Sequence, residues 1–301
     1  MLLRVLCALC GKSSKMHISE INIYPIKSLK GIRLESATVE ARGLQYDRRW
    51  MLTDGDNVFF TQREFPRMAL IEVGVADDGL YVTANGFGTL EIALEPQTGN
   101  RRSVTIWRSI CDGDVYPAVV NEWFCDVLGT NCQLVYMPDD SRRSVNPNFD
   151  QGEDIVSFAD GYPIMLLGEE TLTELNSRIE TPLPMNRFRP NIVVSGSEAF
   201  AEDNWQRIRI GEAIFRGTKP CERCVITTVE QSKGEFTGKE PLKTLSMYRL
   251  AKMVMPNRLE ALGVSETAVL FGQNLIAEIA GATIKVGDEL DIIDRSVEAF
   301  S

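Results

Sequence analysis

From His17 to about Tyr116 the chain is a series of short segments that alternate apolar and polar residues and are separated by turn-forming residues. Residues 17–25, HISEINIYP, show the alternation of a half-buried strand. Asp- and Gly-rich stretches at residues 54–57, 77–79 and 112–114 separate further apolar runs, and such stretches are typical of hairpin turns. Many short strands at this spacing predict a β-barrel or a β-sandwich.

The rest of the chain has the pattern of mixed strands and helices. A polar segment with Pro and Gly, residues 141–154, follows the strand-like run CQLVYM, and we place the boundary between two domains there. We predict an extended or disordered start at residues 1–15, a first domain over 16–140 and a second over 141–296. Helices are expected over 121–128, 168–179 and 241–254, and strands over 189–196, 205–218, 223–230 and, as a last pair, 282–293.

The charge of the chain argues against several classes of partner. Its 32 Lys and Arg residues against 42 Asp and Glu residues give a net charge of −10, and no Lys- or Arg-rich run is present. Such a chain is a poor binder of nucleic acid and lacks the polybasic signature of peripheral membrane proteins. No stretch approaches the ~20 apolar residues that a transmembrane helix needs. We expect a cytoplasmic protein that handles a small molecule and binds neither nucleic acid nor membrane.

Cysteine usage points to a reducing compartment. Seven cysteines in 301 residues are an odd number in a long chain, which is not the pattern of a disulfide-stapled secreted domain. The start, MLLRVLCALCGKSSK, resembles a signal sequence only weakly, because its apolar run from Val5 to Leu9 is short and no A-x-A site follows. We expect folded structure from about Met16, with a lipoprotein-type anchor at Cys10 as the alternative.

One histidine, His17, is too few for zinc hydrolases, Ser-His-Asp enzymes and facial-triad iron enzymes. The strongest local motif is KPCERC at residues 219–224. Its C-x-x-C pair fits half of a zinc site, a dithiol redox pair or a single thiolate that binds a soft metal; two ordinary half-buried cysteines are the remaining alternative. Lys219 and Arg223 are expected to lower the pKa of a neighbouring thiol.

Three short basic clusters lie at expected strand ends. In YPIKSLKG, Lys27, Ser28 and the backbone N–H groups of the turn are expected to form a small anion nest. In DRRW, strand alternation sends Arg48 and Arg49 to opposite faces, so that at most one of them lines a given pocket. The third cluster is NRFRPN. Each cluster alone is most often a solvated charge group, but together they predict a phosphorylated ligand.

Nine motifs follow one another between about Ile18 and Ile293: IYPIKSLKG, DRRWMLTD, TQREFPRMALI, NRFRPNIVVSG, EDNWQRIRIG, PCERCVITTV, KEPLKTLSMYR, LFGQN and IKVGDEL. In this order they resemble the MOSC-domain proteins, in particular the subgroup with a preceding MOSC N-terminal β-barrel domain. That subgroup includes mitochondrial amidoxime-reducing components and bacterial reductases of N-hydroxylated bases. The resemblance implies a mainly β fold with α+β elements, made of an N-terminal MOSC-type β-barrel domain and a MOSC β-barrel-like domain.

The resemblance also implies roles for single residues in a cleft between the two domains. In the family, the second cysteine of PCxRC ligates molybdenum, and here it is Cys224. Asp160 matches an acidic residue before the helix that opens the MOSC domain, and it or Glu222 is the candidate for passing protons. Glu222 replaces a small polar residue of the relatives, which changes the charge beside the metal. The matches to cofactor-binding positions are Lys27, Ser28, Arg48, Arg189 and Asn191.

We therefore predict an oxidoreductase that binds the molybdenum cofactor, molybdopterin with Mo, and reduces N-hydroxylated compounds such as hydroxylamines, amidoximes and N-hydroxylated bases. The chain ends soon after Asp294 without the four-cysteine ferredoxin-like domain of many bacterial members. Its electrons are thus expected from a separate reductase, ferredoxin or cytochrome. The alternatives are a non-catalytic cofactor carrier or sulfur-transfer module, and a degenerate binder without molybdenum.

Overall fold

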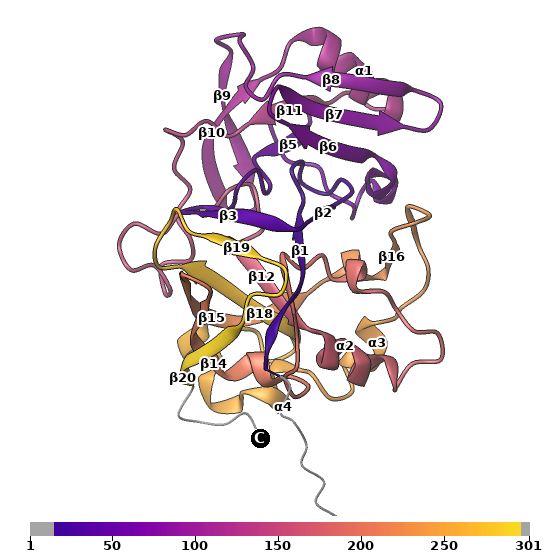
Figure 1. The fold of residues 1–301 in the computed structure, drawn as a ribbon. Helices are drawn as coiled ribbons and strands as arrows, with labels where there is room; N and C mark the ends of the chain where they lie inside the picture. The colour runs from indigo at the N-terminus through magenta and orange to yellow at the C-terminus, as the bar shows by residue number, and fades with distance from the viewer. Residues whose placement is uncertain (1–14, 296–301) are drawn as a thin grey trace, which may run out of the picture.

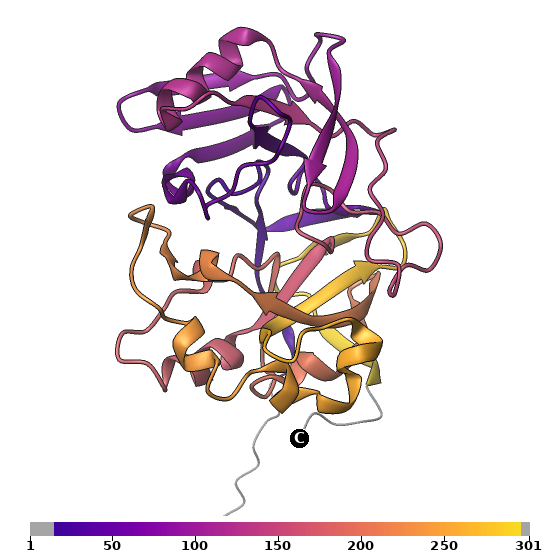
Figure 2. The same cartoon turned by 180° about the vertical axis from the view of Figure 1, so that it is seen from behind.

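The computed structural model describes residues 15–295, and the expectations for residues 1–14, including the anchor at Cys10, lie outside the described part. The chain forms two parts stacked on one another, an upper part built mainly from residues 50–137 and a lower part that contains most later elements (Figure 1, Figure 2). Among the described residues, no helix has both the length and the apolar character to cross a membrane.

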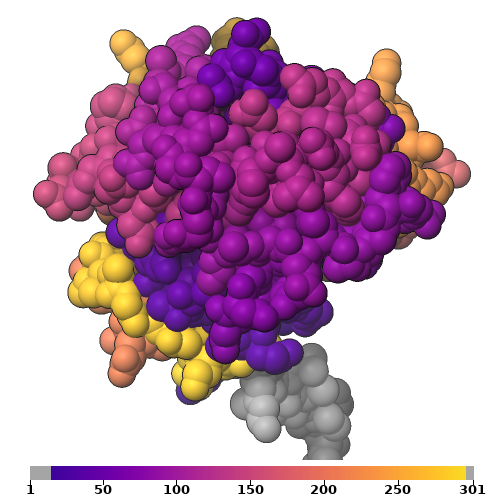
Figure 3. Space-filling view, turned by 90° about the horizontal axis from the view of Figure 1, so that it is seen from above, coloured from indigo at the N-terminus to yellow at the C-terminus, as the bar shows by residue number. Residues whose placement is uncertain are grey.

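The upper part contains two antiparallel sheets and a helix. One sheet has the strand order β5-β11-β10-β9 and the other the order β6-β7-β8. The bounds are β5 (Trp50–Thr53), β6 (Glu72–Ala76), β7 (Gly79–Ala84), β8 (Gly88–Ile92), β9 (Arg101–Ile106), β10 (Ser109–Val115), α1 (Ala118–Leu128) and β11 (Gln133–Tyr136). Fully buried Trp50 and Phe124 are the largest side chains of the core that joins them. Seen from above, these elements cover most of the molecule (Figure 3).

The lower part is organised around an eight-stranded sheet in the order β2-β1-β13-β12-β18-β15-β14-β20. The bounds are β1 (His17–Ile23), β2 (Ile32–Leu34), β12 (Ile164–Gly168), β13 (Ile192–Ser195), β14 (Trp205–Ile210), β15 (Ala213–Arg223), β18 (Val269–Ala277) and β20 (Leu290–Arg295). The first strand thus belongs to the lower sheet, where Ile18 of β1 lies opposite Val194 of β13. Because β1 and β2 come from before residue 140 but share a sheet with strands from after it, the domain boundary at residue 140 stays a prediction.

Short elements complete the fold. A fourth sheet, with the order β19-β3-β4, joins residues from near both ends of the chain, and β16 pairs with β17 in a two-stranded sheet. The bounds are β3 (Ser36–Glu40), β4 (Gly43–Leu44), β16 (Val229–Glu230), β17 (Glu235–Phe236), β19 (Thr283–Lys285), α2 (Glu169–Asn176), α3 (Leu242–Leu245), α4 (Ala251–Val254), α5 (Leu259–Leu262), and the 3₁₀-helices η1 (Pro66–Leu70), η2 (Met185–Arg187), η3 (Ala201–Asn204), η4 (Val225–Thr228) and η5 (Pro256–Arg258). The expected class, mainly β with α+β elements, is confirmed.

One of the three expected hairpin turns is wrong. Residues 77–78 connect β6 and β7 in a hairpin, as expected. Residues 54–57 also form a turn, but the segments on its two sides are paired only by an isolated bridge between Thr53 and Phe59. The turn between β9 and β10 lies at residues 107–108, whereas residues 112–114 are inside β10. A Cβ atom on Gly113 would make contacts at 3.4 Å with side-chain atoms of Val104 and Val135, which is ordinary packing, so this glycine does not mark a turn.

The expected strand over 223–230 is also wrong. Strand β15 runs through the KPCERC motif to Arg223, and the chain then turns into η4. The hydroxyl of Thr227 donates to the Cys224 carbonyl at 2.9 Å and that of Thr228 to the Val225 carbonyl at 2.8 Å. Such local bonds from threonine side chains to the backbone compete with strand pairing.

Three further expectations fail because backbone groups pair differently than predicted. The helix expected over 241–254 is two short helices, α3 and α4, because Leu250 between them is extended and bridges to Val269. The last two strands do not pair with each other: β19 pairs with β3, and β20 with β14. The anion nest of the YPIKS turn is not free either, because the amides of Lys27, Leu29 and Lys30 donate to backbone carbonyls.

We predict that Gly217→Ala lowers the free energy of unfolding by ~1–3 kcal/mol, the range of overpacked cores. Gly217 lies at an irregularity of β15, where an added Cβ would overlap the carbonyl oxygen of Trp205. Gly74→Ala is the matched control, because its Cβ would meet its nearest neighbour, in Tyr81, at 3.8 Å, an ordinary contact. Urea unfolding of both variants checks this, and equal stability would contradict the packing argument.

Candidate functional site

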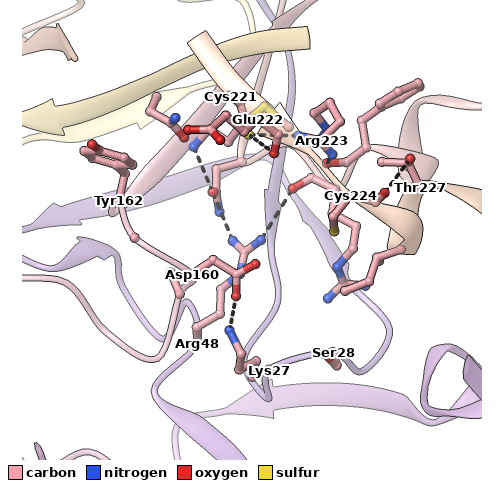
Figure 4. Close-up of a pocket in the computed structure, with 18 of the residues that line it drawn as sticks. Lys27, Ser28, Arg48, Asp160, Tyr162, Cys221, Glu222, Arg223, Cys224 and Thr227 are labelled. Atoms are coloured by element: carbon pink, nitrogen blue, oxygen red, sulfur yellow. Dashed lines mark hydrogen bonds and ion pairs between the residues drawn. The ribbon is translucent and has the colours of Figure 1, made fainter. Parts of the chain in front are cut away.

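A cavity of about 260 Å³ is lined by residues of both parts of the molecule. Figure 4 shows Cys224 and the end of β15 on one side, Lys27 and Ser28 on the other, and Arg48 and Asp160 between them. Every residue that the sequence analysis named as catalytic, metal-binding or cofactor-binding lines this cavity: Lys27, Ser28, Arg48, Asp160, Arg189, Asn191 and Cys224. Their roles there remain predictions.

The cavity is strongly cationic although the chain as a whole is acidic. Two of its lining residues are carboxylates, Asp160 and Glu222, and six are cations: Lys27, Arg48, Arg187, Arg189, Lys219 and Arg223. Only one arginine of the DRRW motif faces the cavity, because Arg49 donates instead to the carbonyl of Met137 at 2.7 Å. Clustered cations of this kind fit an anionic ligand with several acceptor oxygens.

The ring of Tyr24 holds two of these cations. The guanidinium carbon of Arg48 lies 4.3 Å from the ring centroid and that of Arg189 lies 4.1 Å from it. Arg48 also donates to the buried carboxylate of Asp47 at 2.6 Å, while the backbone amide of Tyr24 donates to the other oxygen of Asp47 at 2.8 Å. Burial and the neighbouring Arg48 lower the pKa of Arg189 to about 10, so that the Arg189 guanidinium stays charged at neutral pH.

Three of the predicted ligand residues have left-handed backbone conformations. The φ angles are +69° at Ser28, +49° at Arg48 and +55° at Arg189, a region that residues other than glycine rarely occupy. Strained positions persist where the surrounding structure fixes them, and they concentrate at functional sites. The backbone therefore fixes the direction of these side chains before any ligand arrives.

Asn191 serves Arg48 rather than offering its own carbonyl to a ligand. Its side-chain oxygen accepts from Arg48 at 3.0 Å and from the Met165 amide at 3.2 Å, and its Nδ2 donates to the Asn22 carbonyl at 3.1 Å. Asn191 is fully buried. The residue therefore orients the Arg48 guanidinium within the cavity wall.

Asp160 is held as a carboxylate. Burial favours its neutral form, but the ammonium of Lys27 at 2.5 Å, together with Arg63 and Trp107, holds the pKa of Asp160 well below its usual range. A group of this kind is a weak proton donor at neutral pH, so the geometry does not support the expected proton transfer by Asp160. Asp160 instead fixes the ammonium of Lys27, which also donates to the Phe158 carbonyl at 2.8 Å.

Each cysteine of the C-x-x-C pair contacts an arginine. Arg63 donates to the sulfur of Cys224 at 3.0 Å, and Arg223 donates to that of Cys221 at 3.0 Å. Arg223 lowers the pKa of Cys221 as expected, but burial raises it more, so the net pKa of this thiol lies above its ordinary value. The ammonium of Lys219 forms an ion pair with the carboxylate of Glu222, so the negative charge that Glu222 adds to the motif is compensated.

The donor set fits a phosphate-bearing group that carries a soft metal. Buried nitrogens of Arg63, Arg187 and Arg223 have no hydrogen-bond partner in the described part of the chain, and a buried donor without an acceptor is costly. Cys224 offers sulfur, the preferred ligand of soft metals. Among residues 15–295, no three His, Cys, Asp or Glu side chains are grouped as ligands, so a metal at Cys224 needs further ligands from a bound group.

Sequence reasoning did not single out Arg63, Tyr24 or Trp107. Arg63 lies within the motif TQREFPRMALI and Tyr24 within IYPIKSLKG, so the sequence analysis had marked both segments. The contacts that these two side chains make, however, are with residues far away in the sequence. Trp107 lies at the β9–β10 turn, and its ring packs on the Arg63 guanidinium with 4.6 Å between the ring centroid and the guanidinium carbon. No local pattern of the sequence shows that these segments meet.

We predict that Arg48→Met lowers the free energy of unfolding by roughly 3 kcal/mol at pH 7, because it leaves the fully buried Asp47 carboxylate without its ion partner. The double variant Asp47→Asn/Arg48→Met removes that unpaired charge and is expected to recover part of the loss. Urea unfolding of both variants measures the difference. A double variant as unstable as Arg48→Met alone would contradict the ion-pair account.

Comparison with known proteins agrees with this architecture. Residues 15–131 match the MOSC N-terminal beta barrel domain and residues 153–291 match the MOSC domain. The chain is 32% identical over 281 residues to mitochondrial amidoxime reducing component 2 of Bos taurus, covering 90% of this chain and 81% of that protein. It is 33% identical over 293 residues to mitochondrial amidoxime-reducing component 1 of Mus musculus, covering 92% and 82%.

A plant relative has a much longer chain. The molybdenum cofactor sulfurase of Oryza sativa subsp. japonica is 30% identical over 298 residues, which cover 92% of this chain and 35% of that protein. The matched segment therefore spans both parts of the fold described above. The chain belongs to the proteins in which a MOSC N-terminal β-barrel domain precedes a MOSC domain.

Proposed function

We propose that the protein is a molybdenum-cofactor-dependent reductase of N-hydroxylated compounds. The observation that carries this proposal is the meeting of a thiol, that of Cys224, with six cationic side chains in a single cavity of an acidic chain. A thiol alone would fit many metals, and cations alone would fit any phosphate. Both together fit a phosphorylated ligand with a soft metal, and the amidoxime-reducing relatives supply the substrate class.

In this proposal Cys224 ligates the metal, and Lys27, Arg48 and Arg189 bind the phosphate-bearing part of the cofactor. The cofactor supplies two-electron chemistry at the N–O bond, which the side chains of this protein cannot provide. Ser28, at +69° in φ, offers its hydroxyl to the same ligand. Asp160 keeps Lys27 in place through its ion pair at 2.5 Å.

A second candidate is a sulfur-transfer or cofactor-carrier module. Cys221 lines the same cavity as Cys224, so a second sulfur is available there, and the molybdenum cofactor sulfurase is among the relatives. Retained molybdenum without turnover of any N-hydroxylated substrate under any electron donor would favour this candidate over the reductase.

We predict that Cys224→Ser abolishes molybdenum retention, whereas the matched Cys221→Ser retains most of it. Cys224 lies beyond the end of β15, at the start of η4, while Cys221 is inside the strand and its sulfur accepts a hydrogen bond from Arg223. Metal analysis of both variants after purification from a molybdate-replete host gives the comparison. An equal loss in both would contradict a single thiolate ligand and favour a dithiolate site.

We also predict that the isolated protein does not oxidise NADH or NADPH. Its sequence contains no G-x-G-x-x-G dinucleotide fingerprint, and two electrons must therefore come from an added donor. Turnover is expected with an artificial one-electron reductant or an added reductase, and the rate with a charged donor protein is expected to fall as salt rises. Direct oxidation of NADH coupled to substrate reduction would contradict this prediction.

A further inference from the structure

Arg63 reaches the sulfur of Cys224 from the upper part of the molecule. The neighbouring residue Gln62 is fully buried, and its side-chain amide donates to the Ser28 carbonyl at 2.6 Å. The backbone amide of Arg63 donates to the Thr61 hydroxyl at 3.1 Å. The backbone that carries Arg63 is thus fixed next to Ser28 and Thr61, which line the cavity. Its Nη2 lies 3.0 Å from the Cys224 sulfur. The guanidinium is therefore placed beside the proposed metal ligand by segments far apart in sequence.

The guanidinium of Arg63 is not fully engaged by the protein. The carboxylate of Asp160 lies 3.8 Å from Nη2, because it binds Lys27 more closely at 2.5 Å. Nη1 is buried and has no hydrogen-bond partner among residues 15–295. Since Nη1 and Nη2 belong to one rigid planar group, the unpaired donor lies next to the one that contacts the sulfur. A buried, unpaired donor at this place needs an acceptor that the protein does not supply.

Trp107 fixes the plane of that guanidinium. Its ring centroid lies 4.6 Å from the Arg63 guanidinium carbon, and its Nε1 donates to Asp160 at 3.3 Å. Phe59 packs edge-on against the same ring at 4.9 Å. Trp107 is nevertheless 46% exposed, which is unusual for so large a side chain. Stacking between arginine and tryptophan restricts the direction of the N–H groups, so this contact orients Arg63 toward the site.

We propose that Arg63 is a substrate-positioning and specificity-determining residue of this cavity, with Trp107 as the residue that orients it. This inference rests on the function proposed above. The unpaired N–H donates to the oxygen of the substrate N–O group, next to Cys224. The fixed positive charge disfavours substrates that carry a positive charge, because like charges at close range repel in a partly buried site. The site then prefers uncharged N-hydroxylated compounds over cationic ones.

The test compares two substrates of the molybdenum-loaded full chain, benzamidoxime and the same compound with a trimethylammonium substituent. Arg63→Met is expected to raise the KM of benzamidoxime roughly tenfold or more, with little change in kcat and the same molybdenum content. It is also expected to reduce the preference for the uncharged substrate. Arg63→Lys keeps the charge without the planar fork, so it is expected to raise KM and retain the preference. Arg102→Met is the control, because Arg102 is exposed on β9 and donates to a neighbouring carbonyl.

Several outcomes would overturn the proposal. An unchanged KM and preference in Arg63→Met would do so, and so would a loss of molybdenum in step with the loss of activity, which would make Arg63 a cofactor-retaining residue. If Arg63→Met does not fold, Trp107→Leu tests the same arrangement, and an unchanged KM there overturns the orienting role. If the wild type retains molybdenum but reduces neither substrate, the proposed function fails by itself. In that case, the affinity for benzamidoxime is measured by calorimetry for the wild type and for Arg63→Met. Weaker binding to Arg63→Met supports the positioning role of Arg63, and equal binding to both or no binding to either contradicts that role.

Discussion

Two arginines that repel one another share the ring of Tyr24, and the cavity depends on this arrangement. Arg48 and Arg189 come from different parts of the chain, and each guanidinium carbon lies little more than 4 Å from the ring centroid. The buried carboxylate of Asp47 and the amide of Asn191 fix Arg48 from the other side. Burial raises the pKa of the Tyr24 hydroxyl to about 12, so the ring between the two cations stays neutral. The protein thus holds concentrated positive charge in place before an anion binds.

The course of β15 places the thiol of Cys224 close to these cations. The strand carries the KPCERC motif along the cavity wall and ends at Arg223, so that Cys224 stands at the point where the chain leaves the sheet. Opposite it, Lys27 comes from the loop between β1 and β2, Arg63 comes from a loop of the upper part, and Asp160 links the two side chains. The site is therefore incomplete in either part alone. This explains why the early strands β1 and β2 are built into the lower sheet: their pairing fixes the loop that follows Ile23.

Much of the fold and the site was predictable from sequence, and the failures have a common cause. Strand β1 and the β6–β7 hairpin follow from local alternation and turn residues, and the resemblance to MOSC proteins named seven residues that all line one cavity. Gly113 was misjudged because residues 112–114 pair with β9 inside a strand instead of forming a turn. Arg63 and Trp107 were missed because their contacts join segments far apart in the chain. Local patterns predict elements, but long-range pairing decides which side chains meet.

The proposed function requires that this cavity hold a phosphorylated group together with a metal bound by Cys224. The most direct measurement is the molybdenum and phosphorus content of the full chain purified from a molybdate-replete host. We expect molybdenum and phosphorus together, in stoichiometric amounts with the folded protein. A folded protein that retains zinc at its cysteines, or neither molybdenum nor phosphorus, would contradict it.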